Sequence, residues 1–194
     1  LGVAFVEGGA VMVVEITGAK LLGPVYGSSL YVWSAVLALT LGGLAGGYFL
    51  GARLSRSTTA RSALFGALAL SAVWVAVMPW LAPLVMQATL GLELRLGVTL
   101  ACLVFLVPPL VAFGTVSPMM IRLLAERLAG SGHASGTVYA VSTAGGILFT
   151  LVTAFWAIPV LGKQLTLLLT AAALALPALL YFARLAPRWT GAPA

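Results

Sequence analysis

Residues 7–53 decide the fold of this chain: EGGAVMVVEITGAKLLGPVYGSSLYVWSAVLALTLGGLAGGYFLGAR. Two apolar segments flank a turn-forming stretch, residues 20–29, that is rich in Gly, Pro and Ser. The first segment carries Glu7 and Glu15 in otherwise apolar sequence, and the second carries a row of closely spaced glycines. Small residues let helices approach closely in lipid, so this stretch predicts a membrane hairpin with a polar centre.

The composition of the whole chain points to the same environment. Of its 194 residues, 62% are hydrophobic and 7% are charged, and the mean hydropathy is +1.14. Soluble domains carry about 25% charged residues, so this composition disfavours a soluble fold. A spanning helix needs about 20 mostly apolar residues. The chain is therefore predicted to be an all-α integral membrane protein with six transmembrane helices.

The six spans are expected to form a single transmembrane domain over residues 1–194. Charged residues and helix breakers separate them, with a tight turn at Gly162 before the last. The expected spans are residues 2–19, 30–52, 62–85, 96–120, 137–160 and 165–182.

The distribution of basic residues predicts the orientation. The net charge of +6 is scattered between apolar runs, which indicates a topology signal rather than a nucleic-acid surface. One side of the six-span arrangement collects Arg53, Arg56, Arg61, Arg122, Arg127, Arg184 and Arg188, and the other collects Lys20, Arg95 and Lys163. The first side is expected to be cytoplasmic, which places both termini inside and the protein in the cytoplasmic membrane.

A short internal similarity suggests a repeat. SSLYVWS at residues 28–34 opens the second span, and SGTVYAVS at residues 135–142 opens the fifth. These spans occupy equivalent places in a 3+3 inverted repeat, an arrangement typical of transporter halves. Chance similarity between two short segments is the alternative.

The two glutamates in the first span are candidates for a cation or proton site. A charged group at the bilayer centre costs at least ~2.5 kcal/mol on insertion scales, so such residues are usually paired, protonated or functional. Glu7 and Glu15 differ by about 80° of rotation and roughly 12 Å of rise, too far for one paired site. Glu15 is expected to face another helix, and Glu7 to reach the headgroup region. The alternative is a carboxyl group that only stabilises helix packing.

Small residues in the second and fifth spans predict close helix contacts. The glycines form overlapping GxxxG pairs that fit either a dimer face or packing within the chain, with the first span as the expected partner. They are Gly42, Gly43, Gly46, Gly47 and Gly51. In the fifth span, Ser142 and Thr143 suggest a tightly packed helix or the wall of a modestly polar cavity.

Prolines interrupt the fourth span, and no catalytic motif is evident. Pro108, Pro109 and Pro118 are expected to break or kink this helix, either as a static kink or beside a substrate path. His133 is expected in a flexible loop at residues 129–136, away from other ligands. With no catalytic triad or phosphate loop, the chain is expected to be non-enzymatic and to bind no cofactor or metal.

Four stretches in this order resemble the membrane region of the spermidine-synthase-like family, often described as fused major-facilitator/spermidine-synthase proteins. They are residues 8–33, 41–54, 106–124 and 135–162. The resemblance rests on an acidic residue before the first turn, a Gly-Ser-Ser opening, a Gly-rich second span, a Pro-Pro span and a Tyr-Ala-x-Ser-Thr fifth span. It implies half of a facilitator-type transporter, with Glu15 at the family's acidic position.

The chain also departs from that family. The resemblance implies a soluble aminopropyltransferase-like domain that uses decarboxylated S-adenosylmethionine, but this chain has neither its nucleotide loop nor any Asp. Residues 51–56 read GARLSR where the family often has an Asp, which puts a gating salt bridge in doubt.

The expected function is therefore a non-catalytic membrane module that anchors or assembles with a partner subunit or larger complex in the bilayer. The alternative is a small-solute or polyamine transporter built as a dimer of six-helix halves, with Glu15 at the cation site.

Overall fold

The structure is a computed structural model that describes residues 1–57, 59–125 and 130–189. Every regular element within them is a helix, which confirms the predicted all-helical class. The elements are α1 (Gly2–Tyr26), α2 (Leu30–Leu54), α3 (Ala60–Thr89), α4 (Leu94–Phe105), α5 (Val107–Ala125), α6 (Ser131–Val152), the π-helix η1 (Thr153–Ala157) and α7 (Ile158–Trp189). Arg127 and the side chain of Arg188 lie outside the described part.

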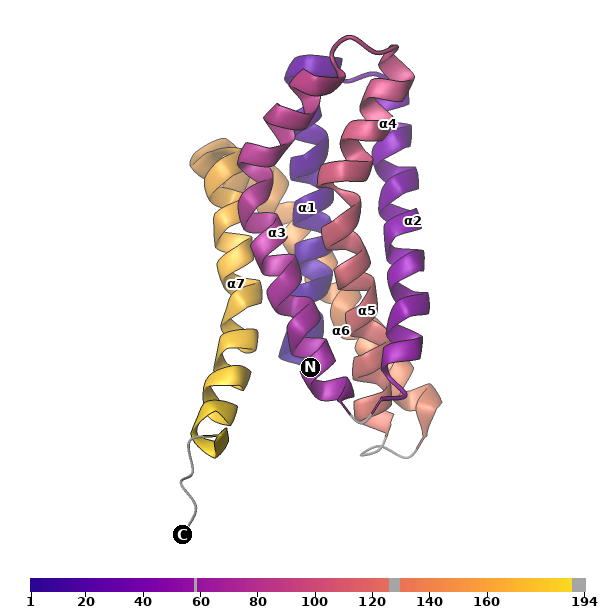
Figure 1. The fold of residues 1–194 in the computed structure, drawn as a ribbon, viewed down its shortest axis with the longest axis vertical. Helices are drawn as coiled ribbons and strands as arrows, with labels where there is room; N and C mark the ends of the chain where they lie inside the picture. The colour runs from indigo at the N-terminus through magenta and orange to yellow at the C-terminus, as the bar shows by residue number, and fades with distance from the viewer. Residues whose placement is uncertain (58, 126–129, 190–194) are drawn as a thin grey trace.

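Five of the described helical runs are long and apolar enough to cross a membrane. The last of them joins α6, η1 and α7 into one run of 54 residues, Ser131–Arg184. Its helical geometry breaks at Gly162, where φ is 78° and ψ is 169°, a conformation that favours glycine. After this break α7 descends towards the end of the bundle where the N-terminus lies (Figure 1).

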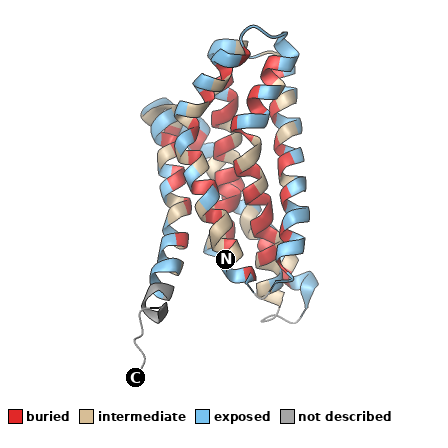
Figure 2. Cartoon of the chain, in the orientation of Figure 1, coloured by how far each residue is buried: buried red, intermediate tan, exposed pale blue. Residues whose placement is uncertain are grey.

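Three pairs of helices make the most extensive contacts. They are α1 with α6, α2 with α5, and α3 with α7. The core between them contains large side chains that are fully buried, among them Phe105, Phe113 and Met78. Buried residues concentrate on the inner helices, whereas α2 and α7 expose long outer faces (Figure 2).

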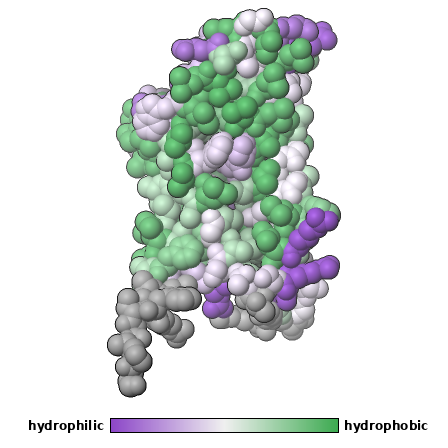
Figure 3. Space-filling model, in the orientation of Figure 1, coloured by the Kyte–Doolittle hydropathy of each residue, from purple (hydrophilic) through white to green (hydrophobic). Residues whose placement is uncertain are grey.

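The outer surface has the character of a lipid-facing surface. Large apolar side chains are exposed on several helices, and Leu41, Leu70 and Phe155 are 68%, 59% and 79% exposed. Soluble monomers rarely expose large continuous apolar patches. Hydrophobic atoms cover the middle of the bundle on the face in Figure 3, and hydrophilic groups gather towards its ends. This distribution defines an all-helical protein of the membrane class.

Several helix boundaries differ from the sequence-based expectation. The first helix was expected to end at residue 19 but continues through Pro24 to Tyr26. His133 was expected in a loop but lies in the first turn of α6. The fourth span is interrupted at Leu106, just before the Pro-Pro pair, whereas Pro118 remains inside α5. Proline is tolerated in the first turn of a helix, so Pro108 and Pro109 begin α5 rather than disrupt it.

Side chains compensate two carbonyl groups that proline leaves without a helical donor. Pro109 has no N–H for the carbonyl of Phe105, and the indole N–H of Trp74 donates to that carbonyl at 3.2 Å. Pro24 likewise leaves the carbonyl of Lys20 free, and the Lys163 ammonium donates to it at 3.3 Å. Backbone polar groups in lipid must be satisfied within the protein, and these two bonds connect the breaks to neighbouring helices.

The Trp74 bond can be tested by removing its donor. Trp74→Phe should lower the free energy of unfolding by about 1 kcal/mol, because the Phe105 carbonyl loses its partner. Denaturation of the purified protein in mixed micelles measures this change. Trp80→Phe is the control, since Trp80 is 52% exposed on the same helix. Equal losses in the two variants would assign the effect to ring size rather than to the hydrogen bond.

Candidate functional site

A carboxyl group lies buried between two helices that touch backbone to backbone. Glu7 on α1 is 3% exposed, and the Ser142 hydroxyl on α6 donates to its Oε2 atom at 3.4 Å. Gly8 lies against the backbone of Ser142, and Gly145 lies against the carbonyl of Phe5, with no room for a Cβ at either position. These two glycines bring α6 close enough to α1 to cover Glu7.

A second pair of helices forms the facing wall in the same way. Gly47 on α2 lies against the carbonyl of Val111 and the Cα of Gly114 on α5. Gly114 in turn lies against the carbonyl of Leu44, where a Cβ would approach to 2.5 Å. This contact places the neighbouring Tyr48 beside the space that Glu7 borders.

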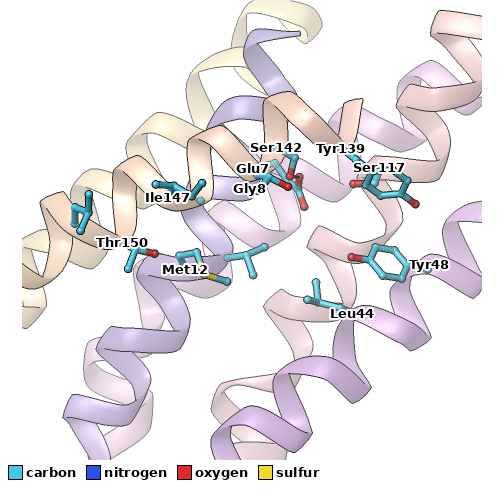
Figure 4. A pocket seen from close by; sticks show the side chains of 14 residues that line it. Glu7, Gly8, Met12, Leu44, Tyr48, Ser117, Tyr139, Ser142, Ile147 and Thr150 are labelled. Carbon is cyan, nitrogen blue, oxygen red and sulfur yellow. Dashed lines mark hydrogen bonds between the residues drawn. The ribbon is translucent and has the colours of Figure 1, made fainter. Parts of the chain in front are cut away.

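The space between the two pairs is a cavity of about 460 Å³. Residues of α1, α2, α5 and α6 line it, and Figure 4 shows Glu7 and Ser142 on one side with Tyr48 on the other. Apart from Glu7, the polar lining consists of hydroxyl groups. They belong to Tyr48, Ser117, Tyr139, Ser142, Thr143 and Thr150.

The cavity holds no charge that would balance an ionised Glu7. The one ion pair among the described residues joins Glu93 and Arg95, 3.8 Å apart, and neither of them lines the cavity. An isolated buried carboxylate is costly, so this group requires either a proton or a bound cation. The arrangement can accept a proton, or bind a small cation with help from hydroxyl oxygens.

The two glutamates lie in environments that differ from those the sequence predicted. Glu7 was expected at the headgroup region, but it is buried against α6 and lines the cavity. Glu15 is half-buried and is not among the cavity-lining residues. The physical reason is the close approach of α6 at Gly8, which covers the N-terminal part of α1.

The predicted glycine row divides between two faces of α2. Gly43, Gly47 and Gly51 lie against α5, and a Cβ at Gly42 or Gly46 would meet open space. The contact is therefore within the chain, but its partner is α5 rather than the expected first span. Three of the five glycines therefore join α2 to α5, and Leu44 and Tyr48 of α2 line the cavity.

Of the remaining candidate residues, some line the cavity and others do not. Ser142 and Thr143 both line the cavity. Pro118 follows Ser117, which lines it, whereas Pro108 and Pro109 lie at the break between α4 and α5 and do not. The Pro-Pro break is thus a structural feature of the bundle, separate from the polar space.

Sequence reasoning missed the tyrosines that face Glu7. Tyr48 and Tyr139 are 40% and 50% exposed and stand at the mouth of the cavity. The available signal was the placement of small residues: Gly8 follows Glu7 directly, and Gly145 lies three residues after Ser142. Such pairs of small residues on two helices predict backbone contact and the burial of the side chains beside it.

Metal-binding chemistry has little support in the described residues. They contain no group of three or more His, Cys, Asp or Glu side chains that could hold an ion. Cys102 is buried in the core without a second thiol, and His133 lies in the first turn of α6.

The fold and the cavity define a class: an all-helical membrane protein with a polar cavity between helix pairs. Comparison with family models, curated proteins and solved structures finds no match for this chain.

The glycine contacts that shape the cavity can be tested with a matched pair. Gly47→Ala should lower the free energy of unfolding by about 1–3 kcal/mol, because the added methyl meets the α5 backbone. Gly46→Ala should leave it unchanged or raise it slightly, since alanine favours a helix and the site is open. Denaturation in mixed micelles compares the two. Equal effects would show that the α2–α5 contact does not depend on glycine.

Proposed function

We propose that this chain is a non-catalytic, six-crossing membrane module whose polar cavity is completed by a second membrane unit. The observation that carries this proposal is the cavity itself: a buried carboxyl group and six hydroxyl-bearing side chains line a space that reaches the outer surface of the bundle. The proposal includes the correspondence, suggested by the sequence resemblance, between its six crossings and half of a facilitator-type transporter. The second unit is a partner subunit or a second copy of this chain.

The cavity opens on a surface that would otherwise face lipid. Its mouth includes exposed residues of α2 and α6, among them Tyr48, Tyr139 and the 61% exposed Ile147. Lipid tails offer no hydrogen bonds, so an uncovered polar space at this depth is unfavourable. A second unit packed across α2 and α6 would enclose it and convert an open groove into an internal compartment.

The pairing of helices supports an inverted repeat. In such a repeat, a pseudo-two-fold axis would relate α1 to α5, α2 to α6 and α3 to α7. The contact of α1 with α6 would then correspond to that of α5 with α2, and the contact of α3 with α7 would correspond to itself. These are the three pairs with the most extensive contacts. The similarity between residues 28–34 and 135–142 falls on α2 and α6, which such an axis relates. Treating Gly162 as the turn before the last crossing gives the six spans this repeat requires.

The basic residues support a cytoplasmic position for the termini. Arg53, Arg56 and Arg61 lie at the connection from α2 to α3, and Arg122 lies in the last turn of α5. By the positive-inside rule, we propose that this end faces the cytoplasm and that the protein lies in the cytoplasmic membrane.

A second candidate function is the transfer of a proton or small cation through the completed cavity. The observation that favours it is that Glu7 faces hydroxyl groups and no described cationic side chain. In this proposal the cation or proton site is Glu7, whereas the sequence favoured Glu15. Transport of a small solute or polyamine, which the family resemblance suggests, is part of this second proposal.

Disulfide cross-linking in native membranes tests the assembly. On a Cys102→Ala background, Leu41→Cys on α2 and Ile147→Cys on α6 should form cross-linked species, because they lie on the proposed assembly face. Leu84→Cys on α3 should not, although its parent residue is 64% exposed, close to the 68% and 61% of the other two. Cross-linking from α3 alone would contradict the proposed face, and none from α2 and α6 would exclude a second copy of this chain as the unit that covers it.

Ion transfer is tested in proteoliposomes that contain a pH-sensitive dye. Under an imposed potential, Glu7→Gln should reduce proton flux at least about tenfold. A tenfold change corresponds to a free-energy difference of about 1.4 kcal/mol. Glu15→Gln should keep most of the flux, because Glu15 does not line the cavity. Assembly should persist in both variants. A wild-type protein without flux would exclude this second function and leave the assembly proposal standing.

A further inference from the structure

A second polar pocket lies at the end of the bundle opposite to Glu93 and Arg95. It has a volume of about 420 Å³ and forms where α2 connects to α3 and α5 ends. Two guanidinium groups and five hydroxyl groups line it, those of Arg61, Arg122, Ser55, Ser57, Thr59, Ser62 and Tyr181. It shares no lining residue with the Glu7 cavity.

Fixed contacts hold the walls of this pocket. A guanidinium N–H of Arg122 donates to the carbonyl of Ser55, which ties the end of α5 to the end of α2. The hydroxyl groups of Ser62 on α3 and Tyr181 on α7 lie 3.0 Å apart, and Tyr181 stacks on Phe65 with ring centroids 4.2 Å apart. Four helices therefore converge on the two arginines.

The charge of the pocket suits an anion. Neither Arg61 nor Arg122 forms an ion pair with a carboxylate in the described part of the chain. The pocket also includes the first turn of α3, where the helix dipole favours negative charge. Planar guanidinium groups bind phosphate oxygens in pairs, so phosphate is the anion that fits best.

An apolar groove continues from the same pocket. It has a volume of about 340 Å³ and shares Arg61 and Leu123 with the polar pocket. Its other walls are apolar side chains of α3 and α5 with the start of the chain, including Leu64, Phe65 and Leu124. A polar pocket that opens into an apolar groove matches a molecule with an anionic head and a hydrocarbon tail.

We propose that these two spaces form one binding site for an anionic phospholipid. The phosphate binds to Arg61, Arg122 and the surrounding hydroxyl groups, and one acyl chain lies in the groove beside Leu64 and Leu124. Basic pockets between helices at the cytoplasmic side of a membrane bind anionic headgroups in this way. A free phosphate would leave the groove unused, so the ligand is the lipid. The site is independent of the proposed assembly and of Glu7.

Lipid retention by the purified protein tests the site. Native mass spectrometry compares phosphatidylglycerol with phosphatidylcholine of the same acyl chains. The wild-type protein should retain phosphatidylglycerol preferentially, and Arg61→Gln should weaken that retention about fivefold. Arg61→Lys should weaken it less, because the charge remains. The matched control is Arg53→Gln, which removes the same charge at the same end from a side chain that stacks on Phe49 at 4.2 Å.

Two further measurements separate the lipid from a free phosphate. Leu124→Trp fills the groove and should reduce phosphatidylglycerol retention while leaving the arginines in place. Glycerol phosphate, the headgroup without its tails, should compete poorly with the lipid. Equal effects of Arg61→Gln and Arg53→Gln, or equal retention of the two lipids, would overturn the site. Full competition by glycerol phosphate would overturn the lipid as its ligand.

Discussion

Backbone contact between helices at glycine is the constraint on which the rest of this structure depends. In lipid no hydrophobic force drives helices together, so close packing must supply the attraction. Gly8 and Gly145 join α1 to α6, and Gly47 and Gly114 join α2 to α5. The two joined pairs leave the polar cavity between them, and the core side chains of α3, α4 and α5 fill the space behind it.

The bilayer also explains how the polar groups are distributed. Two carbonyl groups that prolines free inside the bundle accept hydrogen bonds from side chains of other helices, Phe105 from Trp74 and Lys20 from Lys163. The Glu7 carboxyl has one hydrogen bond, from Ser142. A buried carboxyl group with one hydrogen bond and no ion-pair partner among the described residues is costly to ionise, which is why the proposed function centres on it rather than on the prolines.

The candidate site was predictable in its composition but not in its position. The sequence singled out Glu7, Glu15, the α2 glycines and Ser142 because charges and small residues are rare in spans. It ranked Glu15 above Glu7, because a residue near a helix end was expected to reach the headgroups. It also chose the wrong partner for the α2 glycines, since a small-residue stripe on α1 and the one on α5 are equally compatible with close packing.

The sequence by itself determined the membrane class, the helical content and the approximate bounds of most helices. These follow from local properties: apolar length, charge and breaker residues act on the segment that contains them. Only the tertiary structure decided that α2 packs on α5, that α6 covers Glu7 and that two arginines meet beside an apolar groove. Those features depend on how each helix is rotated about its axis, which is set by contacts between residues far apart in the chain.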